Sequence, residues 1–255
     1  MKVFIIGGTG FIGSHLINEL SSKNFEIIST KRKNSIPRVL IKKEPLWIDS
    51  ENISEIKSAL HKSNILVNCA AVGVSPQKSN WSEMIDYNIT QTIMFLIIAK
   101  EAGVKNFLYL GTDMEANSKL YSKKKAQKLT PYTATKTAAF HLIASYSIQN
   151  KLNMKYIKLP NVYGEGQYPL NLWPSLRGAA LSGKDFKILN KNHIKNFLSI
   201  KKTVKLISND LDSFSNSNKK FEIINIKGEE KKVGEFAEKF WTKWKAKGKL
   251  IYEGK

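Results

Sequence analysis

The chain has 255 residues, 42% of them apolar, and its 41 basic and 21 acidic side chains give a formal net charge of +20. This apolar fraction excludes an intrinsically disordered chain and suffices for one large core or a main domain with a small lobe. The longest apolar run, Ile93 to Ala99, has seven residues, whereas a membrane span needs about 20. The short apolar run at the N-terminus enters a glycine turn rather than a cleavage site, so we do not expect export, and the single cysteine, Cys69, cannot form an internal disulfide. We therefore expect a cytoplasmic protein without a membrane span.

The positive charge could attract phosphate groups without any sequence readout. Only three of the basic residues are arginines, Arg32, Arg38 and Arg177, whereas specific base contacts and bidentate phosphate clamps favour arginine. We interpret the charge as a solvated, lysine-rich surface and do not expect specific nucleic-acid binding. No cluster of cysteine and histidine has metal-ligand spacing, so we expect no metal site.

Short apolar runs alternate with amphipathic segments, which is typical of parallel strands joined by helices. We predict strands at Lys2–Ile6, Glu26–Thr30, Ile65–Cys69, Phe107–Leu110, Lys155–Leu159 and Glu222–Ile226. We predict helices at Gly13–Ser22, Ser54–His61, Ser82–Ala102 and Thr133–Asn150, and Gly103 ends the third of them. The stretch after Pro160 is rich in glycine and proline, which indicates an excursion from the sheet with a return at Asn196–Ile200.

A glycine-rich turn, Gly7-Gly8-Thr9-Gly10-Phe11-Ile12-Gly13, follows the first predicted strand and opens the first predicted helix. The first glycine permits a tight turn, Gly10 lets the backbone approach a pyrophosphate, and Gly13 lets the helix pack closely on the strand. The amides that begin the helix then face the anion. The turn predicts an α/β fold in which a doubly wound parallel sheet of the Rossmann type binds a dinucleotide. We expect this domain to span residues 1–163, with 196–228 returning to it, and a small substrate lobe to comprise residues 164–195 and 229–255.

The end of the second predicted strand indicates which dinucleotide binds. A carboxylate at this place accepts hydrogen bonds from the adenosine ribose of NAD. Here the residues are Thr30-Lys31-Arg32-Lys33, and a basic cluster can bind the 2′-phosphate of NADP. We therefore favour NADP over NAD, while a merely solvated lysine run remains the alternative.

Tyr132 and Lys136 stand at i and i+4 on one face of a predicted helix. A tyrosine has an unperturbed pKa near ~10, and a nearby cation stabilises the phenolate, which brings the pKa closer to the range useful for proton transfer with a carbonyl oxygen. Thr112 ends an upstream strand at the edge where doubly wound sheets bind ligands, so its hydroxyl could hold the reacting oxygen.

The order of these motifs resembles the extended short-chain dehydrogenase/reductase family, which comprises nucleotide-sugar epimerases, dehydratases and reductases. The resemblance covers nearly the whole chain. It rests on the glycine turn, Asn68-Cys69-Ala70-Ala71, Asn88-Ile89-Thr90-Gln91-Thr92, Gly111-Thr112-Asp113, Tyr132 to Lys136, Leu159-Pro160-Asn161-Val162-Tyr163-Gly164, Lys195 to Ile200 and Asn225-Ile226-Lys227-Gly228.

The resemblance implies a role for each matching residue. Tyr132 would be the acid/base, Lys136 would bind the nicotinamide ribose and lower the pKa of the tyrosine, and Thr112 would orient the sugar. The cofactor cleft would be lined by Gly7, Thr9, Gly10, Phe11, Ile12, Gly13, Thr30, Lys31, Arg32, Ile48, Asp49, Ala70, Ala71, Val72, Asn88, Leu110, Pro160 and Val162, besides Tyr132 and Lys136. The substrate would meet Thr112, Asp113, Asn161, Arg177 and Lys195.

Two departures from the family pattern bear on the site. Family dehydratases that carry Thr-Asp follow it with a glutamate used for elimination, whereas Met114 follows here and Glu115 lies one step further. Trp47 occupies the position of an aspartate that holds the adenine, so that contact depends on Asp49. Of these two departures, the first bears on the reaction. Met114 cannot abstract a proton, so elimination is less favoured than simple hydride transfer.

We therefore favour an NAD(P)-dependent oxidoreductase that uses NADPH to reduce a 4-keto nucleotide-linked hexose. An NAD-dependent 4-epimerase is the alternative, followed by a 4,6-dehydratase, and a non-catalytic binding protein of the same fold is the rival from another class. The family pattern also implies a homodimer through the helices predicted at 82–102 and 133–150. The sequence stops at Lys255, while most relatives continue, so the lobe is either short or truncated.

Overall fold

The computed structural model describes residues 1–74, 80–115, 129–216 and 220–253. The chain divides into two compact units. Unit 1 comprises Met1–Leu159 and Val204–Ile226, and unit 2 comprises Pro160–Thr203 and Lys227–Lys255. Residues 160–163, 196–203 and 227–228, which we expected in the first domain, group with unit 2.

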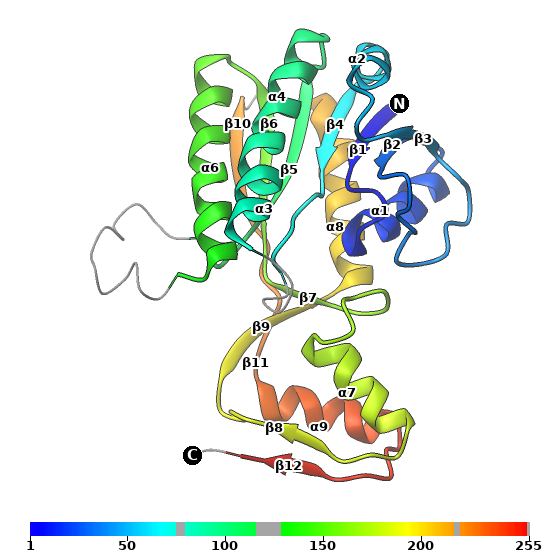
Figure 1. The fold of residues 1–255 in the computed structure, drawn as a ribbon, viewed down its shortest axis with the longest axis vertical. Helices are drawn as coiled ribbons and strands as arrows, with labels where there is room; N and C mark the ends of the chain where they lie inside the picture. Colours follow the sequence, from blue (N-terminus) through cyan, green and yellow to red (C-terminus); the bar gives the residue numbers. More distant parts are fainter. Residues whose placement is uncertain (75–79, 116–128, 217–219, 254–255) are drawn as a thin grey trace. The chain divides into compact units, whose positions relative to one another are not determined.

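Unit 1 is built on a seven-stranded sheet in which every neighbouring pair of strands is parallel (Figure 1). Its order is β10-β6-β5-β4-β1-β2-β3, which confirms the predicted doubly wound Rossmann fold. The strands are β1 (Lys2–Ile6), β2 (Glu26–Lys31), β3 (Leu46–Asp49), β4 (Ile65–Asn68), β5 (Asn106–Thr112), β6 (Asn153–Leu159) and β10 (Phe221–Asn225). The strand order reverses between β1 and β4, and such switch points hold the ligands of open α/β sheets.

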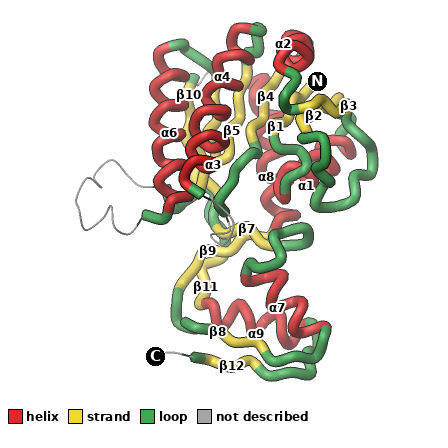
Figure 2. The backbone as a smooth tube through the Cα atoms, viewed as in Figure 1, coloured by secondary structure: helices red, strands yellow, loops and turns green. Residues whose placement is uncertain are grey.

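Helices cover both faces of this sheet, as the red and yellow layers of Figure 2 show. They are α1 (Phe11–Ser22), α2 (Ile53–His61), α3 (Trp81–Ile85), the π-helix η1 (Asp86–Gln91), α4 (Thr92–Glu101), α6 (Pro131–Gln149), α8 (Ile200–Asp212) and the 3₁₀ turn η3 (Ser213–Asn216). Phe4 and Ile6 share one core with buried residues of α2, α4 and α6. Because side chains alternate along a strand, Val3 and Ile5 face the opposite side, where the buried Leu16 of α1 lies.

The helix predicted at 82–102 is one helical stretch with a π turn inside it, α3-η1-α4. A π turn takes an extra residue into the helix and is often found at functional sites. The predicted end at Gly103 is confirmed, because Gly103 has φ +84° and a Cβ there would meet open space. The strand β3 and the helix α8 were not predicted. β3 has only four residues and lies at the sheet edge, so its apolar pattern is short.

Unit 2 has its own apolar core, formed mainly by aromatic rings. Phe197 and Phe236 stack with centroids 3.8 Å apart, and Trp241 is buried and donates from Nε1 to Gly248 O at 3.0 Å. The elements are β7 (Asn161–Tyr163), α7 (Leu172–Leu181), β8 (Phe186–Ile188), β9 (Ile194–Ser199), β11 (Glu229–Lys232), α9 (Val233–Lys243) and β12 (Leu250–Tyr252). They form a three-stranded sheet, β11-β9-β7, and a two-stranded sheet, β12-β8.

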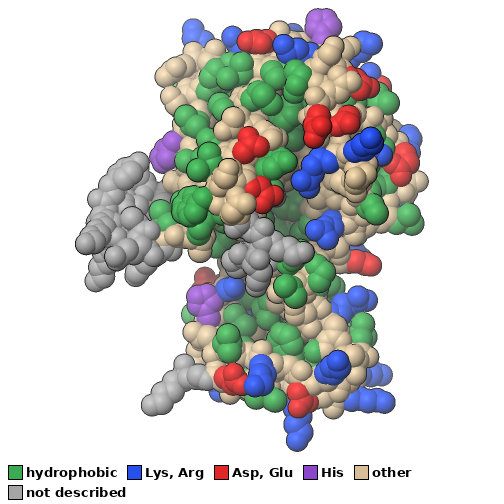
Figure 3. Space-filling model, in the orientation of Figure 1, with side chains coloured by type: hydrophobic (Ala, Val, Ile, Leu, Met, Phe, Trp, Pro, Cys, Tyr) green, Lys and Arg blue, Asp and Glu red, His purple; other side chains and the backbone are tan. Residues whose placement is uncertain are grey.

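Basic side chains lie dispersed over the face seen in Figure 3, with acidic, apolar and uncharged side chains between them. This distribution fits a solvated lysine-rich surface better than a continuous basic groove on that face. Among the described residues, no helix has both the length and the apolar content needed to cross a membrane.

Candidate active site

The glycine turn lies between β1 and α1, at the carboxyl edge of the sheet. Gly7 has φ +82°, and a Cβ there would lie 2.8 Å from the backbone nitrogen of Ala70. A Cβ on Gly13 would lie 2.2 Å from Gly7 O. Both contacts are with backbone atoms, so only glycine fits at these two positions.

The first turn of α1 has the properties of an anion site. Its N-cap is Gly10, no side chain caps it, and its first turn holds no acidic residue. The turn also contains Thr9, Phe11 and Ile12. The backbone carbonyl oxygen of Thr9 accepts a hydrogen bond from the Arg38 amide. Helix N-terminal amides and the helix dipole favour a phosphate at this place. The residues present therefore fit a dinucleotide pyrophosphate.

The loop after β4 is held by two buried asparagines. Asn68 accepts at Oδ1 from the Ala70 amide at 2.9 Å. Asn88, in η1, accepts at Oδ1 from the Val72 amide at 2.9 Å and donates from Nδ2 to Val72 O at 3.0 Å. Asn88 Nδ2 also donates to Thr135 Oγ1 at 3.0 Å. These bonds connect the loop, which contains the predicted cofactor residues 70–72, to η1 and α6.

Two cations at the end of β2 lie over aromatic rings. Lys31 Nζ is 5.5 Å from the centroid of the Trp47 ring, and the Arg32 guanidinium is 5.8 Å from that of Tyr87. Such contacts stabilise a cation without removing its charge. Thr30, the residue before Lys31, is buried. The structure thus brings Lys31 and Arg32 together with two aromatic rings at the predicted cofactor end of the sheet.

The end of β3 presents a different pair of residues. Ile48 is buried in the core shared with α2 and α4. Asp49 is exposed, pairs in register with Lys31, and accepts at Oδ1 from the Glu51 amide at 3.0 Å. Its carboxylate therefore caps the following turn.

The predicted acid/base pair lies in the first turns of α6. Thr130 caps this helix by accepting from the Thr133 amide at 3.2 Å, and Pro131 begins it. Lys136 is buried and donates from Nζ to Leu110 O at 2.8 Å. The predicted cofactor residue Leu110 is thus tied to α6 by its carbonyl oxygen.

The pKa of Tyr132 differs in direction from our expectation. Burial raises the pKa of the Tyr132 phenol, and the nearby carboxylates of Glu115 and Asp113 raise it further. Burial lowers the pKa of Lys136, and Glu115 and Cys69 oppose that effect. We predicted that Lys136 would lower the pKa of Tyr132, but the two carboxylates and the desolvation dominate here. Tyr132 is therefore a phenol, the form that donates a proton.

Thr112 ends β5 with its hydroxyl already engaged. Its Oγ1 accepts from the Met114 amide at 3.3 Å and donates to Asp113 Oδ1 at 3.4 Å. Burial raises the pKa of Asp113, and the hydrogen bond from Thr112 opposes that effect. Met114, which stands where family dehydratases carry their eliminating glutamate, is 51% exposed.

Sequence reasoning missed the environment of Glu115. Its side chain is fully buried, and its Oε1 accepts from the Thr112 amide at 2.9 Å and from the Tyr156 hydroxyl at 2.8 Å. Its Oε2 lies 3.4 Å from Lys158 Nζ. A Cβ on Gly111 would lie 2.6 Å from Glu115 Oε1 and 2.3 Å from Tyr156 Cε1, so glycine makes room for both groups. In the sequence, Tyr156 and Lys158 stand two residues apart and therefore share one face of the predicted strand.

The remaining predicted residues belong to unit 2. Pro160 precedes β7, which contains Asn161 and Val162. Asn161 Nδ2 donates to Asn196 O at 3.3 Å. Arg177 is an exposed residue of α7 whose guanidinium lies 5.9 Å from the centroid of the Trp173 ring. Lys195 lies on β9 opposite Lys231 of β11.

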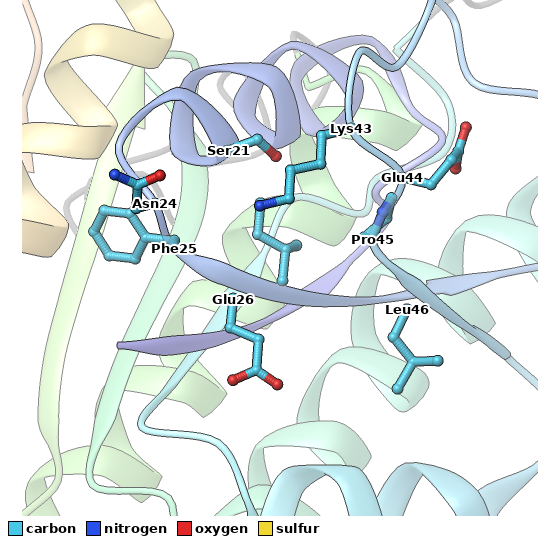
Figure 4. A pocket seen from close by; sticks show the side chains of 9 residues that line it. Ser21, Asn24, Phe25, Glu26, Lys43, Glu44, Pro45 and Leu46 are labelled. Atoms are coloured by element: carbon cyan, nitrogen blue, oxygen red, sulfur yellow. The ribbon is translucent and has the colours of Figure 1, made fainter.

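A separate cavity of about 290 Å³ lies near the amino ends of β2 and β3 (Figure 4). It is lined by Ser21, Asn24, Phe25, Glu26, Ile27, Lys43, Glu44, Pro45 and Leu46. Because Glu26 and Leu46 begin their strands, this cavity is at the sheet edge opposite the glycine turn. It is not the predicted dinucleotide site.

Comparison with known proteins decides the family. The model of the NAD dependent epimerase/dehydratase family matches residues 3–226. The chain belongs to this family. The match confirms the resemblance to the extended short-chain dehydrogenases/reductases.

Within the family, the chain is 28% identical over 261 residues to a dTDP-D-glucose 4,6-dehydratase of Dictyostelium discoideum, covering 88% of this chain and 60% of that protein. It is 31% identical over 123 residues to a UDP-glucose 4-epimerase of Klebsiella pneumoniae, covering 43% of this chain and 87% of that protein. The match to the human dTDP-D-glucose 4,6-dehydratase covers 54% of that enzyme. The chain thus spans a little over half the length of these dehydratases.

Solved structures show the same fold. A UDP-glucose 4-epimerase of Thermotoga maritima, solved with UDP-glucose, aligns with TM-score 0.81 and 18% identity over 99% of this chain and 85% of that one. A dTDP-glucose 4,6-dehydratase of Bacillus anthracis, solved with NAD, aligns with TM-score 0.77 and 19% identity over 100% of this chain and 85% of that one.

Proposed function

We propose that this epimerase/dehydratase family member is an oxidoreductase of nucleotide-linked sugars, and that its reaction is the NADPH-dependent reduction of a 4-keto hexose. The observation that carries the choice of cofactor is the pair of cations, Lys31 and Arg32, at the end of β2. Met114 supports reduction over elimination, because the side chain after Asp113 cannot abstract a proton.

NADPH, when bound, supplies the hydride that reaches the carbonyl carbon. Tyr132 donates its phenol proton to the carbonyl oxygen, which gives the alcohol, and solvent then returns a proton to the phenolate. Thr112 orients that oxygen through its hydroxyl, whose proton turns from Asp113 Oδ1 to the substrate oxygen. Lys136 binds the ribose next to the nicotinamide and stabilises the phenolate that forms.

The same proposal assigns the binding residues. The turn from Gly7 to Gly13 holds the pyrophosphate, and Lys31 and Arg32 hold the 2′-phosphate. Asp49 and the loop residues Ala70, Ala71 and Val72 line the cofactor cleft. Asp113, Asn161, Arg177 and Lys195 bind the nucleotide sugar.

The test is a fluorescence titration of the protein with NADPH and, separately, with NADH. We expect NADPH to bind more tightly, and we expect Arg32→Asp and Lys31→Asp to weaken NADPH binding at least tenfold while NADH binding changes little. The exposed Lys33 lies in the same basic run, so Lys33→Asp is the matched control for a general charge effect. Equal weakening by all three variants, or a preference for NADH, would contradict the NADP assignment.

A 4-epimerase is the second candidate, favoured by the similarity to UDP-glucose 4-epimerases. Such an enzyme retains NAD and returns the hydride to the other face of the sugar. Co-purified NAD, together with no net oxidation of NADPH by a 4-keto nucleotide sugar, would support it. A 4,6-dehydratase ranks third, because Glu115 is buried and bound by three groups.

We also propose a homodimer through the helices α4 and α6. The two helices contact each other. On α6, the side chains of Leu142 and Ile148 are exposed, with exposed fractions of 45% and 60%. Large apolar side chains that are exposed on a surface helix fit a helix-to-helix interface. Light scattering should give twice the mass of one chain, and Leu142→Lys with Ile148→Lys should give a monomer.

A further inference from the structure

Behind the end of β5 lies a set of buried groups that the proposed reaction does not use. Glu115 is bound by the Thr112 amide, by the Tyr156 hydroxyl and by Lys158. The Glu115 amide in turn donates to Thr112 O at 3.2 Å. Thr112 and Glu115 therefore bond each other in both directions, which fixes the turn that contains Asp113 and Met114.

Burying a charge costs free energy, because the group loses its hydration. Only hydrogen bonds and an opposite charge in the interior offset that loss. Glu115 Oε2 has Lys158 at 3.4 Å but accepts no hydrogen bond. Lys158 Nζ lies 4.4 Å from the centroid of the Phe140 ring and its side chain is only 12% exposed. A neutral glutamine could make the same bonds to Thr112 and Tyr156, so the turn alone does not explain the carboxylate.

Glu115 lies near the strand residue that binds Lys136. Lys136 Nζ donates to Leu110 O at 2.8 Å, and a Cβ on Gly111, the next residue of β5, would lie 2.6 Å from Glu115 Oε1. The helix α6 contributes Tyr132 and Lys136, and β6 contributes Tyr156 and Lys158. Asp113 lies in the Thr112 turn, and Cys69, the residue after β4, opposes the lowering of the pKa of Lys136. The negative charge of Glu115 raises the pKa of Tyr132 and opposes the lowering of the pKa of Lys136 by burial.

We propose that Glu115 is a positioning residue that fixes the Thr112 turn and places a buried negative charge near Tyr132 and Lys136, where it disfavours the phenolate and favours the ammonium. This inference rests on the proposed function, because Tyr132 must carry its proton when a carbonyl is reduced. Oxidation of a hydroxyl requires the phenolate instead, and the carboxylate makes that form of Tyr132 less populated.

The experiment measures the ionisation of residue 132 directly. 3,5-Difluorotyrosine, whose phenol is more acidic than that of tyrosine, is incorporated at position 132 and its ¹⁹F shift is followed against pH. Glu115→Gln retains an oxygen that accepts from Thr112 and Tyr156 but removes the charge. We expect the titration midpoint to fall by roughly one pH unit, because a like charge nearby has been removed.

Three variants make the result specific. Glu51→Gln, an exposed residue, removes one negative charge elsewhere and should leave the midpoint unchanged. Tyr156→Phe removes a hydrogen bond to Glu115 but keeps the charge, so the midpoint should stay within a few tenths of a unit. If Glu115→Gln alone does not fold, Glu115→Gln with Lys158→Met removes the pair together, and the midpoint should again fall. An unchanged midpoint in the folded variants that lack the carboxylate overturns the proposal.

Turnover separates this inference from the proposed function. With NADPH and a dTDP-linked 4-keto-6-deoxyhexose as probes, we expect the alkaline limb of kcat/KM to move to lower pH in Glu115→Gln. Absence of turnover in the wild type would contradict the proposed reaction, while the fluorine titration would still decide the role of Glu115.

Discussion

Asn88 holds the backbone of Val72 by both ends of its amide, accepting from the amide N–H at 2.9 Å and donating to the carbonyl oxygen at 3.0 Å. The same nitrogen donates to Thr135 Oγ1. One buried side chain therefore fixes the loop after β4 against the helix that carries Tyr132.

Asn88→Ala should destabilise the protein by about 1–3 kcal/mol, because it leaves the amide and the carbonyl oxygen of the part-buried Val72 without their side-chain partner. It should also weaken dinucleotide binding, since Val72 lies in the predicted cleft. Urea unfolding and the fluorescence titration measure the two effects. Asn18 makes a similar bridge, to Leu40 O and the Lys42 amide, on an exposed segment, so Asn18→Ala should leave dinucleotide binding unchanged. Equal binding losses in both variants would contradict a local role.

Tyr132→Phe removes the hydroxyl that gives the proton and should lower kcat by about 10²–10⁴-fold. The melting temperature should change little. Tyr146→Phe is the matched control, because Tyr146 belongs to the same helix, and its activity should be unchanged. Full activity of Tyr132→Phe on every 4-keto nucleotide sugar would refute the catalytic assignment and favour a non-catalytic binding protein.

Gly13→Ala places a Cβ 2.2 Å from Gly7 O, which the backbone can relieve only by moving. We expect dinucleotide binding to be lost and the protein to be destabilised. In Gly178→Ala the Cβ meets open space within the helix α7, so this variant should be stabilised by about 0.5–1 kcal/mol. Thermal melts and NADPH titrations of both proteins compare the two sites.

Cys69 should react slowly with thiol reagents in the folded protein. Burial raises the pKa of its thiol to about 12 from 9.0, and Lys136 opposes the shift. The reactive thiolate is then roughly a thousandfold scarcer below pH 9 than in the unfolded chain. Labelling by iodoacetamide should keep rising with pH beyond 9, and a plateau there would contradict the shift. Since the unfolded thiol ionises first, this group lowers folding stability as pH rises from about 9 to about 12.

The fold and the place of the glycine turn were predictable because their determinants are local. One turn between a strand and a helix contains Gly7, Gly10 and Gly13. The strand before it, β1, has the predicted bounds. Tyr132 and Lys136 lie on one helix, so their spacing alone places them together.

The electrostatics of the site could not be predicted in the same way. Glu115 contacts Tyr156 and Lys158, which lie on a strand about 40 residues further along the chain. No local spacing in the sequence indicates such a contact. The expected lowering of the pKa of Tyr132 used Lys136 alone and omitted burial and two carboxylates. The bonds of Asn88 in η1 likewise join residues 16 and 47 positions away in the chain.

The missing side chain at Gly111 has an evolutionary consequence. The space that it leaves is filled by Glu115 and Tyr156, so these three positions cannot change independently. A relative with alanine at position 111 should carry a smaller side chain at position 115 or at position 156. The smaller side chain should have arisen first, while position 111 was still glycine. In an alignment of relatives, positions 111, 115 and 156 should therefore covary as one set.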